Sequence, residues 1–130
     1  MLENKYIELT RNSSGENASV SMWLKTLVFP SGNQVVFVDD SSKLAFGFYA
    51  GANAIITCGT SVAIVPNIKN YWINNEWNHV VVTKNGAVFA CYINNKKVPL
   101  STTNNNTWTH NKSNVMIIGC RYSSEYNTFY

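Results

Sequence analysis

Apolar and polar side chains alternate with a period of two along most of the chain, and no helical period is sustained anywhere. In the segment 18–27, one face carries Val20, Met22 and Leu24, and the other carries Ser19, Ser21, Trp23 and Lys25. Successive side chains of a strand point to opposite faces of its sheet, so this pattern is typical of a strand buried on one face. The alternation predicts an all-β protein.

The clearest local pattern predicts a meander of three antiparallel strands. These strands cover 80–83, 87–93 and 96–100, and two tight turns join them at Asn85-Gly86 and Asn94-Asn95. Asn-Gly is the dipeptide that most favours a type I′ turn, because both central residues of that turn need a positive φ.

Further strands are expected on both sides of this meander. A polar loop is expected over 101–114 and an irregular aromatic segment over 121–130, while the other predicted strands cover 6–10, 18–27, 34–38, 44–50, 54–58, 61–65 and 115–120. A length of 130 residues fits one domain. Roughly nine or ten short strands in one domain indicate an antiparallel β-sandwich or jelly roll.

The composition excludes several classes of protein. With 45% hydrophobic and 13% charged residues, the chain is not of the disordered class. The net charge of +3 comes from scattered cations with one adjacent pair, Lys96-Lys97, so no basic stripe for nucleic acid exists. No apolar run approaches the ~18 to 20 residues of a membrane span, and no membrane insertion is expected.

Two residue types stand out in the sequence. The 19 Asn residues favour turns and left-handed backbone, and they also supply uncharged groups suited to hydrogen bonds with sugars. The three cysteines, Cys58, Cys91 and Cys120, lie in apolar strand-like sequence without the spacing of a zinc site. We expect buried thiols, with one disulfide as the alternative.

Five sequence blocks occur in a characteristic order: YIEL at 6–9, VSMWLK at 20–25, EWNHVVVT at 76–83, CYINNKKV at 91–98 and MIIG at 116–119. This order resembles the concanavalin A-like lectin/glucanase superfamily, and within it the laminin G-like (LamG, jelly roll) domains. The resemblance implies one β-sandwich domain over 1–130 that is a portion of a larger extracellular, cell-surface or virion-surface protein.

The resemblance also implies a missing strand. Similar family members usually continue after the aromatic segment into a Gly-x-Ile-Asp-x-x-Arg-Ile-Tyr strand that closes the back sheet, and this sequence stops at Tyr130. An open sheet edge invites pairing with another chain. The chain is therefore expected to be a fragment of a longer protein, or to form a homo-oligomer in which a neighbouring subunit completes the sheet.

Catalysis is not expected. The glucanase branch uses a strand with Glu-x-Asp-x-x-Glu, because retaining hydrolysis needs two carboxyl groups roughly 5 to 5.5 Å apart. Here no two acidic residues have that alternate spacing on a strand, which excludes a glycosidase of this type. Of the two histidines, His79 is expected to be a buried imidazole bonded to backbone, and His110 lies in the polar loop.

No cofactor is required, but one calcium ion is an alternative, since many members of the family hold one. Asp39 and Asp40 form an acidic pair after a predicted strand, a suitable place for a hard cation. The other interpretation of this pair is a simple turn.

Aromatic residues are the candidate binding surface, because sugar rings stack on Trp and Tyr. Trp23 belongs to a family block and is expected to pack in the core. Trp77 likewise belongs to a family block, and half exposure at the start of its strand is the alternative for it. The candidates are Tyr71, Trp72, Trp77, Trp108, His110, Tyr122 and Tyr126, followed by Phe129 and Tyr130. The alternative is that these rings cover the core under long loops.

The resemblance implies a non-catalytic module that binds a glycan or a protein surface. Two alternatives stay open. One is a structural or assembly domain completed by strand pairing with a neighbouring subunit, and the other is an accessory domain of a glycoside hydrolase.

Overall fold

The computed structural model describes residues 6–10, 17–39, 44–49, 51–58, 60–104 and 115–119, of which 6–10, 38–39, 102–104 and 115–119 are described by their backbone alone. Eleven strands and one 3-10 helix lie in this part of the chain. They are β1 (Tyr6–Thr10), β2 (Ala18–Lys25), β3 (Gln34–Asp39), β4 (Leu44–Tyr49), β5 (Asn53–Cys58), β6 (Ser61–Val65), η1 (Ile68–Asn70), β7 (Trp77–Asn85), β8 (Val88–Ile93), β9 (Lys96–Val98), β10 (Ser101–Asn104) and β11 (Val115–Gly119).

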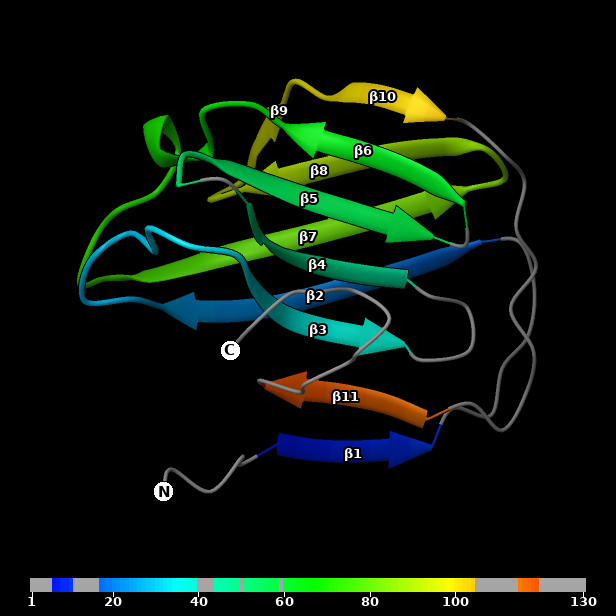
Figure 1. Cartoon of the computed structure of the whole chain (residues 1–130), viewed down its shortest axis with the longest axis horizontal. Coiled ribbons are helices and arrows are strands. Elements are labelled where there is room, and N and C mark those ends of the chain that lie inside the picture. Colours follow the sequence, from blue (N-terminus) through cyan, green and yellow to red (C-terminus); the bar gives the residue numbers. More distant parts are fainter. Residues whose placement is uncertain are drawn as a thin grey trace.

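The strands form two antiparallel sheets. The larger sheet has seven strands in the order β1-β11-β3-β4-β5-β6-β10, and the smaller one has four in the order β2-β7-β8-β9. Figure 1 shows the smaller sheet stacked behind the larger one, with β11 and β1 continuing the larger sheet beyond the edge that β2 forms. The predicted antiparallel β-sandwich is confirmed.

The core lies between the facing rows of the two sheets. Side chains along β5, β7 and β8 alternate strictly between buried and less buried positions. The buried row of the larger sheet includes Phe46 and Ile56, and that of the smaller sheet includes Val80, Val82 and Ile93. Burying one such side chain contributes roughly 1.5–3 kcal/mol, so these rows fix which face of each strand points inward.

The first meander turn differs from its prediction. Because Asn85 pairs with Val88, the central residues of this turn are Gly86 and Ala87, and of these only Gly86 has a positive φ, at 55°. This is the requirement of a type II′ turn, so the type I′ prediction for Asn85-Gly86 is wrong.

The second meander turn is as predicted, and its backbone is of the type I′ kind. Asn94 and Asn95, with φ of 50° and 65°, join Ile93 to its partner Lys96. Both central residues have positive φ, which Asn tolerates better than most residues.

The predicted polar loop over 101–114 contains a strand at its start. Ser101–Asn104 forms β10, which pairs with β6 and ends the larger sheet. An edge strand has one neighbour and tolerates polar residues, so the hydrophobic pattern gave no indication of it.

Cys58 and Cys91 are both buried thiols, as predicted, and Cys120 lies outside the described residues. Burial raises the pKa of the Cys91 thiol from 9.0 to about 12, although a backbone hydrogen bond at Tyr92 opposes this shift. At neutral pH Cys91 is therefore the protonated thiol and packs as a small apolar side chain.

Gly47 generates a prediction about stability. It lies on β4 opposite the place where the β3 register shifts between Val35 and Phe37, and a Cβ at Gly47 would lie 2.4 Å from the carbonyl oxygen of Gln34. We expect Gly47→Ala to lower the free energy of unfolding in urea by about 1–3 kcal/mol. Gly32→Ala is the control, since a Cβ at Gly32 would have no non-neighbouring atom within 4 Å. This control should change the free energy of unfolding by less than about 0.5 kcal/mol. Equal free energies of unfolding for the two variants would contradict the close approach of β3 to Gly47.

Candidate functional site

The outer face of the smaller sheet carries a cluster of aromatic side chains. Because Val80 and Val82 of β7 point into the core, the alternate residues Trp77 and His79 point outward. Trp23 on β2 pairs directly with His79, and Lys25 pairs with Trp77. Trp23, Trp77 and His79 therefore share one face, and we call these three residues the aromatic platform.

The two indoles of the platform are open to solvent. Trp23 is 61% exposed and Trp77 is 62% exposed. The Trp23 and His79 rings stack with centroids 4.7 Å apart and planes inclined by 21°. Trp77 is the diagonal neighbour of Trp23, a position that long side chains on adjacent strands can bridge. The Trp23–His79 stack and the exposed Trp77 thus lie on one face, and no strand among the described residues covers it.

Polar groups border the platform. A hydrogen bond of 2.8 Å joins the Ser21 Oγ to the His79 Nε2, which fixes the orientation of the imidazole. Ser19, Ser21 and Lys25 occupy the exposed row of β2 on either side of Trp23. Hydroxyl, imidazole and ammonium groups thus lie beside the indole faces.

Asn78 holds the loop that leads into the platform. Its side chain is fully buried on the opposite face of β7. Its Oδ1 accepts the N–H of Ile73 at 2.9 Å, and its Nδ2 donates to the carbonyl oxygens of Ile73 at 2.8 Å and Glu76 at 3.0 Å. A single amide therefore satisfies three backbone groups of the segment just before Trp77.

Asn94 holds the next residue of the strand. Its backbone N–H donates to the carbonyl oxygen of His79 at 2.9 Å, and its Oδ1 accepts the N–H of His79 at 2.9 Å. Its Nδ2 donates to the Asn78 Oδ1 at 3.0 Å and to the carbonyl oxygen of Tyr71 at 3.4 Å. Asn94, in the turn between β8 and β9, thus fixes the backbone of His79 on β7.

Two family-block residues lie elsewhere than expected, and for Trp77 the exposed alternative is the one observed. Trp23 was expected to pack in the core, but its ring lies on the outer face. His79 was expected to be a buried imidazole bonded to backbone, but its ring bonds Ser21 and stacks on Trp23. The alternation in 18–25, which places Trp23 with three polar residues, was the signal that identifies this face.

The prediction that Trp72 contributes a binding surface is wrong. Trp72 is 7% exposed and belongs to the core, where its Nε1 donates to the Thr26 Oγ1 at 2.9 Å. Tyr71 is partly buried and packs against the same core. The positions of these two rings fit the alternative interpretation, in which they cover the core beneath a loop.

The other predicted site residues stay predictions. Asp39 is the last residue of β3 and is described by its backbone alone. Within the described ranges no three His, Cys, Asp or Glu side chains are grouped in a way that would hold a metal ion. The residues that lie outside the described part of the chain are Asp40, Trp108, His110, Tyr122, Tyr126, Phe129 and Tyr130.

Two antiparallel sheets packed over one core define a β-sandwich domain. In this domain the aromatic platform lies on the outer face of the smaller sheet. The family model Laminin_G_3, described as the concanavalin A-like lectin/glucanases superfamily, matches residues 3–130. The chain therefore belongs to this superfamily, as its sequence blocks implied. Laminin G-like domains are generally non-catalytic, commonly mediate adhesion or carbohydrate binding, and typically occur in extracellular proteins.

A solved structure with the same fold is the mouse laminin alpha1 chain, domains LG4-5. The two share 10% sequence identity with a TM-score of 0.66, and the match covers 95% of this chain and 34% of that chain. The chain thus spans about one third of that two-domain structure. No curated protein matches the sequence. Among the described residues no helix is long and apolar enough to cross a membrane.

We predict that Asn78→Ala lowers the free energy of unfolding by about 2–4 kcal/mol, because it leaves the backbone groups of Ile73 and Glu76 without their partner in a buried place. Urea denaturation measures this change. Asn85→Ala is the control, since Asn85 is exposed at the end of the same strand. A loss below about 1 kcal/mol for Asn78→Ala would mean that the loop does not depend on this amide.

Proposed function

We propose that the chain is a non-catalytic carbohydrate-binding module and that the aromatic platform is its binding surface. The observation that carries the proposal is the pair of half-exposed indoles, Trp23 and Trp77, held on one rigid sheet face. In the proposal the module belongs to an extracellular, cell-surface or virion-surface protein.

The chemistry of the platform supports a sugar ligand. The apolar C–H face of a pyranose stacks on an indole, and polar groups beside the ring bond the hydroxyls and fix the orientation. Here Ser21, His79 and Lys25 supply those polar groups. The surface is held by the Asn78 and Asn94 hydrogen bonds, so little ordering entropy is lost when a sugar binds.

Binding to a panel of immobilised polysaccharides and glycans tests the proposal. We expect Trp23→Ala and Trp77→Ala each to weaken binding at least tenfold, because each removes one stacking surface. Val88→Ala should bind as the unchanged protein does, since Val88 is 66% exposed on the outer face of the same sheet but lies outside the platform.

Two results would contradict the proposal. One is that no glycan is bound by the unchanged protein. The other is that glycan binding survives when both Trp23 and Trp77 are replaced. Circular dichroism of each variant confirms that the sandwich is intact, which the exposure of both indoles leads us to expect.

A second candidate function, assembly through strand pairing, is favoured by the edge strand β2. This strand pairs with β7 alone among the described strands, and it runs for eight residues without Pro, Gly or a bulge. Its inward residues Val20, Met22 and Leu24 are only partly buried. An edge strand that has no second neighbour among the described strands, and whose apolar row is only partly buried, is suited to pairing with a second copy.

Sedimentation velocity over a range of concentrations tests this second candidate. If β2 pairs with a second copy, the unchanged protein forms dimers and Met22→Lys shifts them to monomers, because an inward-pointing charge blocks edge pairing. If the unchanged protein stays monomeric at every concentration, β2 does not pair with a second copy. Ser19→Lys, on the outward row, is the matched control and should leave a dimer largely intact.

A further inference from the structure

An apolar cluster of side chains projects from one end of the sandwich, beyond the platform. Leu27 and Val28, in the loop between β2 and β3, are 77% and 73% exposed, and Ile73, in the loop before β7, is 55% exposed. We call these three residues the apolar tip. Exposed apolar patches of about a few hundred Å² on soluble proteins are often functional.

The two loops of the tip are joined to each other. The backbone N–H of Asn75 donates to the carbonyl oxygen of Thr26 at 2.7 Å, and the Trp72 Nε1 donates to the Thr26 Oγ1 at 2.9 Å. Since Thr26 directly precedes Leu27 and Asn75 follows Ile73 by two residues, these bonds bring the two loops that carry the aliphatic side chains together.

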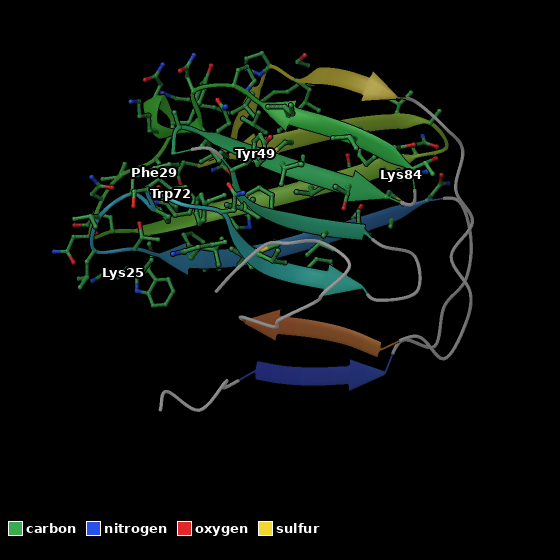
Figure 2. All side chains as sticks on the ribbon, viewed as in Figure 1. Lys25, Phe29, Tyr49, Trp72 and Lys84 are labelled. Atoms are coloured by element: carbon green, nitrogen blue, oxygen red, sulfur yellow. The ribbon has the colours of Figure 1, made fainter. Side chains whose placement is uncertain are left out.

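The tip is anchored from beneath by aromatic packing. Phe29 meets Phe48 edge to face with ring centroids 5.2 Å apart and Trp72 at 6.4 Å. Figure 2 shows Lys25, Phe29 and Trp72 at the same end of the sandwich, with Lys84 at the opposite end. The loops are therefore fixed to the core while Leu27 and Val28 stay outside it, which is a pre-organised apolar surface rather than a collapsed one.

The residues behind the tip follow in a definite chemical order. Lys25 ends β2 two residues before Leu27, with Trp77 as its cross-strand partner. At about 3.4 Å per strand residue, Trp23 with its partner His79 lies about 7 Å further along the strand. The order is aliphatic, then Trp with Lys, then water-exposed polar and aromatic groups. Across a bilayer surface the same order occurs, since aliphatic groups enter the hydrocarbon and Trp and Lys sit at the headgroups.

We propose that the apolar tip docks on the surface of a lipid bilayer. Leu27, Val28 and Ile73 enter the acyl boundary, and Trp77 and Lys25 lie at the headgroup level. Peripheral docking reaches about 5–10 Å deep, which leaves Trp23 and His79 in water. This docking requires no membrane-spanning segment; it shares Trp77 with the proposed glycan site, whereas Trp23 and His79 belong to the glycan site alone.

The size of the surface favours a bilayer over a second copy of the chain. The tip with Trp77 offers apolar surface on the order of 400 Å². A stable protein pair buries about 800 Å² on each partner. A bilayer needs no matching partner surface, and a few inserted aliphatic side chains give weak, reversible binding.

Flotation with vesicles tests the proposal. The unchanged protein should float with phosphatidylcholine vesicles that contain phosphatidylserine, and the double variant Leu27→Ser with Val28→Ser should partition at least tenfold less. Val88→Ser is the matched control, because it removes an equally exposed aliphatic side chain at another place. Trp23→Ala should float normally, which separates lipid docking from the glycan site.

A second readout reports the depth of the tip. Vesicles with brominated acyl chains should quench part of the Trp fluorescence, and Trp77→Phe should remove most of that quenching while Trp23→Phe removes little. Three results would overturn the proposal: no flotation of the unchanged protein, equal flotation of the double variant, or a stable dimer that the double variant abolishes. The folding control is urea denaturation, in which the double variant should unfold at the same urea concentration as the unchanged protein.

Discussion

The burial of alternate residues on two facing sheets is the constraint on which the rest of this structure depends. Because Val80 and Val82 of β7 pack against the larger sheet, the alternate residues of the strand, Trp77 and His79 among them, face outward. The same holds for β2, where Val20 and Met22 face the core and Trp23 does not. The aromatic platform is therefore a consequence of the core, since no separate loop or helix presents it.

Asn78, which with Ser61 and Lys84 is a buried polar residue of the described chain, connects the aromatic platform to the apolar tip. Asn78 occupies an inward position of β7, and its amide holds the backbone of Ile73 and Glu76. Ile73 belongs to the apolar tip, and Trp77, next after Glu76, belongs to the platform. A buried amide with all partners satisfied is tolerated in a core and specifies a single arrangement of its neighbours. The geometry of both surfaces is thus set from the inside of the sandwich.

The sequence predicted the strands well because alternation and turn residues are local signals. It did not predict β10, because an edge strand as polar as Ser101–Asn104 lacks an apolar row. For the site, alternation had already placed Trp23 among polar residues, and the error came from assigning this Trp to the core by family block. Trp72 could not be placed, because a loop residue has no period to read, and its burial depends on the distant Thr26 and Phe48.

The abundance of Asn has a structural explanation in the described residues. All non-glycine residues with positive φ among them are Asn, at positions 67, 75, 94 and 95. Other Asn side chains bond backbone within the molecule, as Asn53 does through its Oδ1 to the N–H of Asn67 at 3.0 Å. In the described part of the chain, Asn thus forms turns through its backbone and, at Asn53, Asn78 and Asn94, holds neighbouring backbone through its side-chain amide. Among the described residues, the proposed glycan site therefore depends on the indoles of Trp23 and Trp77 and on the polar groups of Ser21, His79 and Lys25 beside them.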